Sequence, residues 1–186
     1  MKVKGIVIES SIDYIKEKFG DDGIQKIISQ LTPEEKTLFQ FGICKAMWYE
    51  VDFHIHITDL ILKTFYPDQE PVKILREIGA FTAEHDQNSI KKIVYRLGTP
   101  VFMAHFGSWN FNRFYDVGKI KVLKSDSGTL ILIADDLPMY HEYIFERMAG
   151  WMKRAIELCG GQEVAIDPTV KKVNERFQLI FQMTWK

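Results

Sequence analysis

The sequence predicts an α+β fold in which a helical N-terminal layer packs on a small four-stranded antiparallel sheet. Three observations carry this prediction. Apolar residues recur at helical spacing over most of residues 1–117, two strand-like runs flank a turn at Ser125–Gly128, and the run from Phe177 to Trp185 alternates apolar and polar side chains. We therefore expect one domain over residues 1–186, with a mainly helical half at 1–117 and a β-β-α-β-β half with one long helix at 118–186.

The composition excludes several classes of protein. Lys and Arg total 24 against 25 for Asp and Glu, and the pI is about 6.5, whereas a dedicated nucleic-acid binder needs a basic surface. No run approaches the roughly 18 apolar residues of a membrane span, and Met1–Ser10 lacks the apolar core of a secretory peptide. We expect a cytoplasmic protein whose distant cysteines, Cys44 and Cys159, are free thiols.

Three patterns organise the first fifty residues. The β-branched residues of Lys2–Glu9 predict an opening strand. Ser10 is a candidate N-cap for a helix whose apolar spacing stops at Gly20 and then resumes. Thr32-Pro33-Glu34-Glu35 combines an N-cap, a proline for the first turn and a glutamate for a capping box. A further helix is therefore expected to begin at Pro33.

The middle of the chain predicts more helices. Val51–Phe65 fits either a strand or a helix, and we favour the helix because no turn residue interrupts the segment before Tyr66-Pro67. Pro71 opens another helical stretch, which continues or restarts through Leu97 until Gly98-Thr99-Pro100 breaks it.

The period of the pattern changes after residue 118. The strand-like runs Lys119–Lys124 and Thr129–Ala134 flank Ser125–Gly128, which is typical of a hairpin loop. Asp136 and Pro138 are expected to start a long helix, and Gly160-Gly161 to end it.

A second hairpin completes the predicted sheet. Val164 and Ile166 mark a short strand, Asp167-Pro168 is expected to turn it, and the alternating run that ends at Trp185 follows.

The pair His54 and His56 is the first candidate for chemistry. On a strand the two imidazoles would share a face and could ligate a metal, whereas on a helix they diverge by about 200°. No third ligand lies nearby at a typical spacing. We therefore expect no metal site here.

The remaining polar candidates have simpler structural explanations. Glu84-His85-Asp86 fits a polar joint between helices, and Asp136 of the pair Asp135-Asp136 fits a helix cap. The sequence contains no G-x-S-x-G elbow, Walker pattern or G-x-G-x-x-G loop, and Ser108 has no evident base beside it. We therefore expect a protein without enzymatic activity.

Val101–Asp116 is dense in aromatic residues and is predicted as one buried helix. Packed core is the simpler explanation of that density, and a hydrophobic ligand pocket is the functional alternative. Phe102, Phe106 and Trp109 are the candidate pocket residues. His105, in the same helix, either ligates haem through a neutral ring nitrogen or lies at the solvent edge.

Motifs spread over nearly the whole chain resemble an uncharacterised bacterial family that is expanded in myxobacteria, a domain of unknown function. The resemblance rests on short structural motifs of both halves. They are Val3-x-Gly5, Tyr66-Pro67 followed by Ile78-Gly79, the run from Gly128 to Pro138-Met139-Tyr140, Cys159-Gly160-Gly161, and the closing Phe181-Gln182-Met183-Thr184-Trp185.

The order of elements is also similar to a wider fold group, which includes haem nitric-oxide/oxygen-binding domains, 4-vinyl reductase domains and Golgi transport-complex (TRAPP) subunits. This resemblance implies a helical layer over a four-stranded antiparallel sheet, with a pocket between them for haem, small molecules or acyl chains. It transfers no particular ligand, because fold and function separate readily.

The sequence departs from the haem-binding members of that group. Their Tyr-x-Ser-x-Arg motif, which binds the haem propionates, matches Ile133-Ala134-Asp135-Asp136-Leu137 here, so Ile133, Asp135 and Leu137 replace the three functional residues. Asp135 would repel a propionate. His105 lies in the helix of the proximal ligand, about one turn early. The cysteines that hold zinc in the 4-vinyl reductase group are missing, so we expect neither haem nor another cofactor.

We therefore expect a non-catalytic cytoplasmic ligand-binding or sensor module in signalling, with a hydrophobic pocket lined by Phe102, His105, Phe106 and Trp109. Its expected partners are a small or hydrophobic ligand and a signalling protein or second copy, without nucleic acid. One alternative is a homodimerising protein-interaction subunit that has no ligand. A haem-based gas sensor is a further alternative.

Overall fold

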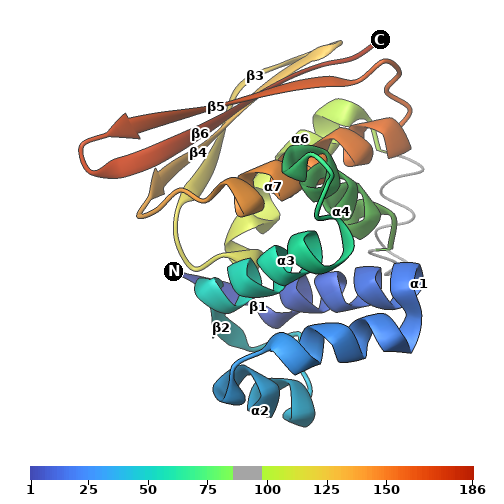
Figure 1. Cartoon of the computed structure of the whole chain (residues 1–186). Coiled ribbons are helices and arrows are strands. Elements are labelled where there is room, and N and C mark those ends of the chain that lie inside the picture. Colours follow the sequence, from blue (N-terminus) through green and yellow to red (C-terminus); the bar gives the residue numbers. More distant parts are fainter. Residues whose placement is uncertain (86–97) are drawn as a thin grey trace. The chain divides into compact units, whose positions relative to one another are not determined.

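The computed structural model describes residues 1–85 and 98–186, and within α6 it leaves out the side chains of 103, 104 and 106–110. The chain forms two compact units, one of Met1–Ile74 with Phe114–Asp116 and one of Leu75–Arg113 with Val117–Lys186. Helices dominate the N-terminal region, and a four-stranded antiparallel sheet occupies the C-terminal half (Figure 1). The predicted α+β fold class is confirmed.

The first unit contains three helices and two short strands. They are β1 (Lys2–Lys4), α1 (Gly5–Gln30), α2 (Pro33–Phe41), β2 (Trp48–Glu50) and α3 (Val51–Phe65). The strands pair antiparallel, and Val3 also bridges to Tyr115. The predicted opening strand is too long, because the helix already begins at Gly5, where a Cβ would lie 2.1 Å from the carbonyl oxygen of Cys44.

Helices α1 and α3 pack together to form the core of this unit. Five isoleucines of the two helices are fully buried, namely Ile8, Ile15, Ile27, Ile57 and Ile61, and each contributes about 1.5–3 kcal/mol by burial. The Phe19 ring stacks on Phe65 at 3.9 Å between centroids. The break predicted at Gly20 is confirmed, because that residue interrupts α1 with a φ of 65°.

The predicted capping box begins α2. Thr32 Oγ1 accepts a hydrogen bond from the Glu35 N–H at 3.3 Å, and Glu35 Oε2 accepts one from the Thr32 N–H at 2.9 Å. The helix begins at Pro33, as expected, and ends before Gly42. None of its nine residues is buried.

The second unit is built on the four-stranded sheet, whose strand order is β3-β4-β6-β5. The strands are β3 (Lys119–Asp126), β4 (Thr129–Leu137), β5 (Ala165–Val173) and β6 (Arg176–Thr184). Alternate residues of the central strands are buried on one face, namely Leu130, Leu132, Ala134, Leu179, Phe181 and Met183. Helix α7 (Glu142–Leu158) contacts β5 and β6, and the Phe145 and Phe181 rings lie 4.9 Å apart.

Two boundaries of the C-terminal half differ from prediction. Helix α7 begins at Glu142, with His141 as its N-cap, and not at Asp136 or Pro138. Asp136 instead belongs to β4 with a φ of 60°, a conformation that a short polar side chain tolerates. The predicted turn at Asp167-Pro168 is also wrong, because β5 runs through it and turns at Asn174-Glu175. A proline is tolerated there because β5 is an edge strand.

The remaining helices are α4 (Pro71–His85) and α6 (Pro100–Phe114). The start predicted at Pro71 is confirmed. The helix predicted over Val101–Asp116 is α6, which begins one residue earlier and ends at Phe114. The predicted continuation of the first of these helices through Leu97 lies largely outside the described residues. No helix among the residues that the structure describes is long and apolar enough to cross a membrane.

Helices α4 and α7 cross at two glycines. A Cβ at Gly79 would lie 2.0 Å from the carbonyl oxygen of Arg147, and one at Gly150 would lie 2.1 Å from that of Arg76. Two ion pairs flank the crossing, Arg76 Nε with Glu146 Oε2 at 2.6 Å and Arg154 Nε with Glu84 Oε1 at 2.7 Å. The two backbones therefore touch where any side chain would separate them.

We predict that Gly79→Ala and Gly150→Ala each destabilise the chain by about 2–4 kcal/mol, because the added methyl must push two backbones apart. At this chain length the melting temperature should fall by roughly 5–12 °C in a calorimetric or circular-dichroism melt.

Gly160→Ala is the matched control, because nothing lies within 4 Å of its Cβ position and its φ is 94°. The control should lose only about 1 kcal/mol from backbone strain. A loss at Gly79 or Gly150 no larger than that of the control would contradict the close crossing.

Candidate functional site

The aromatic helix α6 only partly matches the predicted pocket wall. Phe102 is 46% exposed, and its N–H donates to Thr99 Oγ1 at 3.2 Å. His105 is exposed. The side chains of Phe106 and Trp109 lie outside the described set. The interpretation of the whole segment as one buried helix is wrong at Phe102, and the pocket itself stays a prediction.

The buried end of α6 meets the start of the sheet. Phe111 is 5% exposed, and its ring reaches within 3.4 Å of the Cβ position of Gly118. Leu137, at the end of β4, lies against the same glycine and is also buried. The Asn112 amide donates to the Gly118 carbonyl at 2.9 Å. These contacts join α6 to the end of β4, the stretch that the resemblance matches to the propionate-binding motif.

That stretch contains a β-bulge. Ala134 pairs with Leu179 and Leu137 with Phe177, so β4 has one residue more than β6 between the two pairs. Asp135 and Asp136 lie in this irregularity, and the φ of Asp136 is 60°. A bulge bends its strand and redirects the side chains beside it. The two carboxylates therefore leave the regular alternation of the strand.

Asp135 is the centre of a small polar cluster on the sheet. Its Oδ2 lies 2.6 Å from Lys121 Nζ, and its Oδ1 accepts from Gln178 Nε2 at 2.9 Å. The hydrogen bond from Lys121 lowers the pKa of the Asp135 carboxyl most, and those from Gln178 and the Asp136 N–H lower it further against a smaller effect of burial. Asp135 is therefore a carboxylate over the whole physiological pH range.

A second cation faces the other carboxylate of the bulge. Arg176 Nε, at the start of β6, lies 3.6 Å from Asp136 Oδ1. Lys121 and Arg176 thus each bring a positive charge to the bulge, and each meets an aspartate there. This arrangement leaves the stretch electrically balanced by residues of the chain itself.

His54 and His56 of the first unit point in different directions, because they lie two positions apart on one helix. Both residues belong to α3, as the preferred interpretation of that segment required. His54 is buried, whereas His56 Nδ1 lies 2.8 Å from Glu35 Oε1 and 2.9 Å from Oε2. Burial raises the pKa of Glu35, but the hydrogen bonds of His56 and of the Thr32 N–H outweigh it and the pKa is lowered.

The residues of the other polar candidate, Glu84-His85-Asp86, contact different neighbours. Glu84 pairs with Arg154 across the helix crossing, and the His85 ring stacks on Phe81 at 3.8 Å. Asp86 lies outside the described residues. Within residues 1–85 and 98–186, no group of three or more His, Cys, Asp or Glu side chains is placed to hold a metal ion.

Sequence reasoning identified Asp135 and missed its partners. Lys121 was within reach of prediction, because the β3–β4 hairpin register places it diagonally across from Asp135. Gln178 gave no signal, since it belongs to a strand that pairs with β4 only through a non-local connection. The contact between Glu35 and His56 could not be predicted, because helix periodicity does not indicate which helices pack together.

Comparison with solved structures identifies the architecture. Fe(II) unliganded H-NOX from K. algicida superimposes with a TM-score of 0.65 at 15% identity, covering 98% of this chain and 96% of that one. A mutant H-NOX from T. Tengcongensis gives a TM-score of 0.66 at 12% identity, over 98% and 97% of the two chains. This chain has the H-NOX fold. No family model and no curated protein matches its sequence.

The residues described at the β4 bulge do not fit a haem propionate. Another similar structure concerns the modulation of haem redox potential through protein-induced porphyrin distortion. The stretch that the resemblance matches to the propionate-binding motif has an anionic carboxylate at Asp135, a buried leucine at Leu137 and Ile133. Lys121 and Arg176 are already paired with Asp135 and Asp136. A propionate at this bulge would therefore meet the negative charges of two aspartates.

We predict that Lys121→Met raises the pKa of Asp135, because the strongest hydrogen bond to the carboxylate is lost. Carbon-detected NMR titration of the side-chain carboxyl measures it. Lys119→Met, at the residue paired with Asp135 across the hairpin, is the matched control and should change the pKa less.

The same pair predicts a pH dependence of stability. The pKa of Asp135 is lowered on folding. The ionised carboxylate therefore adds to the free energy of unfolding above its unfolded pKa, and this contribution is lost as the pH falls through the folded pKa. The difference in unfolding free energy between wild type and Lys121→Met should therefore vanish in strong acid. A pKa of Asp135 that is unchanged in Lys121→Met would show that the ion pair has no effect.

Proposed function

We propose that the chain is a non-catalytic ligand-binding or sensor module that uses the H-NOX fold without haem. The support is a whole-chain similarity to H-NOX structures, at TM-scores of 0.64–0.67, combined with the electrostatics of the β4 bulge. The chain keeps the H-NOX fold but lacks the residues that bind the haem propionates in the resembling family. We take this combination to favour binding of a different ligand over the absence of any ligand.

The paired carboxylates of the bulge carry the haem-free part of this proposal. Lys121 is 2.6 Å from Asp135, so its charge is unavailable to an incoming anion. Replacing Asp135 by the serine of the haem-binding motif would remove a negative charge, but Leu137 would still occupy the arginine position as a buried apolar side chain. Haem binding would thus need changes at several coupled positions.

The proposed ligand is small or hydrophobic, and Phe102, Phe106 and Trp109 of α6 are its proposed contacts, with His105 beside them. An aromatic wall binds apolar ligands by burial of surface, and few polar groups are needed to orient them. The proposal extends to a cytoplasmic signalling role, a signalling protein as partner, the TRAPP-like fold relationship and membership of the family expanded in myxobacteria.

A protein-interaction subunit is the second candidate, and one observation favours it. Several large apolar side chains of the first unit are exposed, with Phe41 at 86% and Met47 at 58%. Exposed apolar groups gathered on a surface mark binding sites for other molecules. A haem-based gas sensor is the third candidate, and the following titration tests it directly.

We predict that the purified chain titrated with haemin, oxidised or reduced, develops no sharp Soret band. Haemin should remain as the broad absorbance of free and nonspecifically bound porphyrin. An H-NOX domain from K. algicida, treated identically, is the positive control.

The variant His105→Ala makes this test specific. Its spectrum should match that of the wild type, because no iron ligand is removed. A stoichiometric Soret band in the wild type that is lost in His105→Ala would overturn the haem-free proposal and show that His105 ligates haem.

A further inference from the structure

Strand β4 is apolar on both faces of the sheet. It has an unbroken apolar run from Leu130 to Ala134, whereas a strand with one face in water alternates apolar and polar residues. Leu130, Leu132 and Ala134 are buried on the inner face. Ile131 and Ile133 alternate with them, so they point to the outer face and are only partly buried. Unbroken apolar runs are typical of strands that are covered on both sides.

The strand register joins the outward isoleucines into one surface. Ile133 pairs directly with Ile180 of β6, and the side chains of such a pair lie about 5 Å apart on the same face. Ile131 is two residues from Ile133 along β4 and therefore also points outward. The outward neighbours of Ile180 on β6 are Gln178 and Gln182. The two central strands thus carry three adjacent isoleucines between polar flanks, and we call them the outer isoleucines.

The charges around the outer isoleucines nearly balance. Five basic and four acidic side chains belong to the outward positions of the sheet and to the β4 bulge. They are Lys119, Lys121, Lys124, Lys171, Arg176, Asp126, Asp135, Asp136 and Asp167. Six of the nine are joined in ion pairs within the sheet. A face with one positive charge in excess does not select a nucleic acid or an anionic membrane.

The edges of the sheet are poor places for a partner strand to pair. Pro168 removes one N–H from the edge strand β5, and a bulge at Leu123 interrupts the register of the other edge strand, β3. Prolines and bulges at edges prevent edge-to-edge pairing. A partner that covers the outer isoleucines would therefore pack on the face. In such a sandwich two sheets lie about 10 Å apart with nearly aligned strands.

The outer face is complementary to itself. A two-fold axis parallel to the strands and between β4 and β6 places β4 over β6 of a second copy, and β3 over its β5. Residues of one row of the sheet stay in the same row. Ile133 would then meet the partner's Ile180, because these two residues are register partners within the sheet.

The next row carries opposite charges at its two ends. Lys124 of β3 pairs with Ile131, Ile131 with Gln182, and Gln182 with Asp167 of β5. The same axis brings Lys124 over the partner's Asp167, and this contact occurs twice because the two copies exchange roles. Lys124 also lies 3.1 Å from Asp126, and both side chains are half-exposed. Each Lys124 would therefore lie between two carboxylates.

The size of the outer face fits a weak pair of copies. Four strands of eight or nine residues cover about 19 Å by 30 Å at the standard strand spacing and rise. This flat area of roughly 600 Å² per copy is less than the about 800 Å² of a standard interface and falls in the range of transient ones. Association in the micromolar range or above is therefore expected.

We propose that the outer face of the sheet is the contact surface of a weak two-fold dimer. The outer isoleucines of two copies pack together in it, and Lys124 of each copy faces the partner's Asp167. This assignment goes beyond the proposed ligand-binding function and is independent of it. The inner face remains as it is, because Phe145 of α7 contacts Phe181 on that side.

Sedimentation velocity of the full chain from about 1 to 300 µM tests the dimer. Wild type should shift from monomer toward dimer over this range, with a reducing agent present so that the exposed Cys44 forms no covalent link. Ile180→Thr should raise the dissociation constant at least about tenfold, because apolar surface is lost in both copies. Threonine keeps the β-branched shape, so the sheet should stay folded, as circular dichroism will verify.

A charge reversal tests which residues meet. Asp167→Lys places like charges at Lys124 and should weaken the dimer several-fold. Addition of Lys124→Asp to the same chain should restore association, because the attraction returns with the signs exchanged. Asp167 is exposed on an edge strand, so these variants do not depend on core packing.

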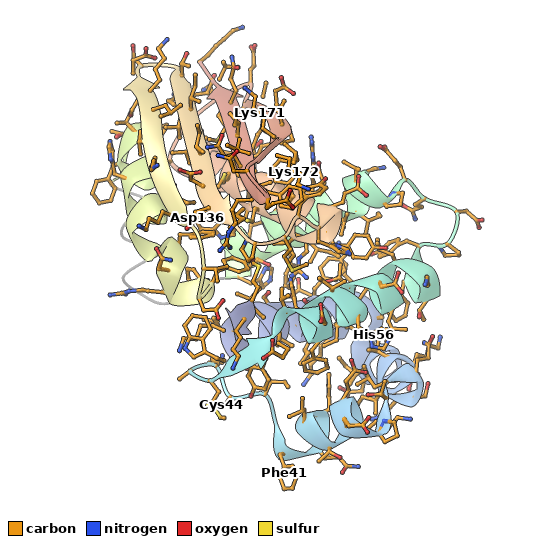
Figure 2. All side chains as sticks on the ribbon, turned by 90° about the vertical axis from the view of Figure 1, so that its left-hand side faces the viewer. Phe41, Cys44, His56, Asp136, Lys171 and Lys172 are labelled. Atoms are coloured by element: carbon orange, nitrogen blue, oxygen red, sulfur yellow. The ribbon has the colours of Figure 1, made fainter. Side chains whose placement is uncertain are left out.

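Two neighbouring lysines of β5, both labelled in Figure 2, provide a matched pair of variants. Lys171 pairs with Gln178 and points outward, in the row that ends at Lys119 of β3, whereas Lys172 pairs with Phe177 and points to the other face. In the dimer Lys171 would face the partner's Lys119. Lys171→Glu should therefore tighten the dimer, and Lys172→Glu, with the same change in net charge, should not.

Phe41→Ser is the control for general stickiness, because this side chain of the other unit is 86% exposed. It should leave the dissociation constant unchanged. Four results would overturn the assignment. They are a monomer at every concentration, equal losses in Ile180→Thr and Phe41→Ser, no restoration of Asp167→Lys by Lys124→Asp, and equal effects of the two β5 lysine variants.

Discussion

The crossing of α4 and α7 at Gly79 and Gly150 is the constraint on which the C-terminal unit depends. Backbone contact at 2.0–2.1 Å from the missing Cβ atoms fixes the separation of the helices, and the ion pairs Arg76–Glu146 and Arg154–Glu84 fix their register. Helix α7 also contacts β5 and β6. The distance between α4 and the helix that contacts the sheet therefore follows from how closely two glycines let two helices approach. A glycine inside a helix costs about 1 kcal/mol relative to alanine, and the close packing offsets that loss.

The sequence was sufficient wherever local chemistry determines structure. The capping box at Thr32, the helix over Val51–Phe65 and the hairpin at Ser125–Gly128 each follow from side chains within a few residues. Prediction failed where tertiary pairing overrides the local signal. Asp136 resembles a helix cap, yet a bulge against β6 makes it part of a strand, and Asp167-Pro168 resembles a turn, yet an edge position lets β5 continue through it. For the site, the family resemblance drew attention to Asp135, but its partner Gln178 comes from a non-local strand that no local pattern indicates.

This chain thus combines the H-NOX fold with an anionic carboxylate, Asp135, in the stretch that the resemblance matches to the propionate-binding motif. Lys121 stabilises Asp135, and Asp135 balances the charge of Lys121.

Native mass spectrometry of the chain purified from cells supplied with a haem precursor tests the central claim most directly. The account predicts a mass larger than that of the chain, because the protein carries a bound small molecule other than haem. This molecule should stay bound during mild desolvation and be released at higher collision energy. A haem adduct in one-to-one ratio with the chain would contradict the haem-free use of the H-NOX fold. A chain that carries no small molecule after gentle purification would contradict its role as a ligand-binding module.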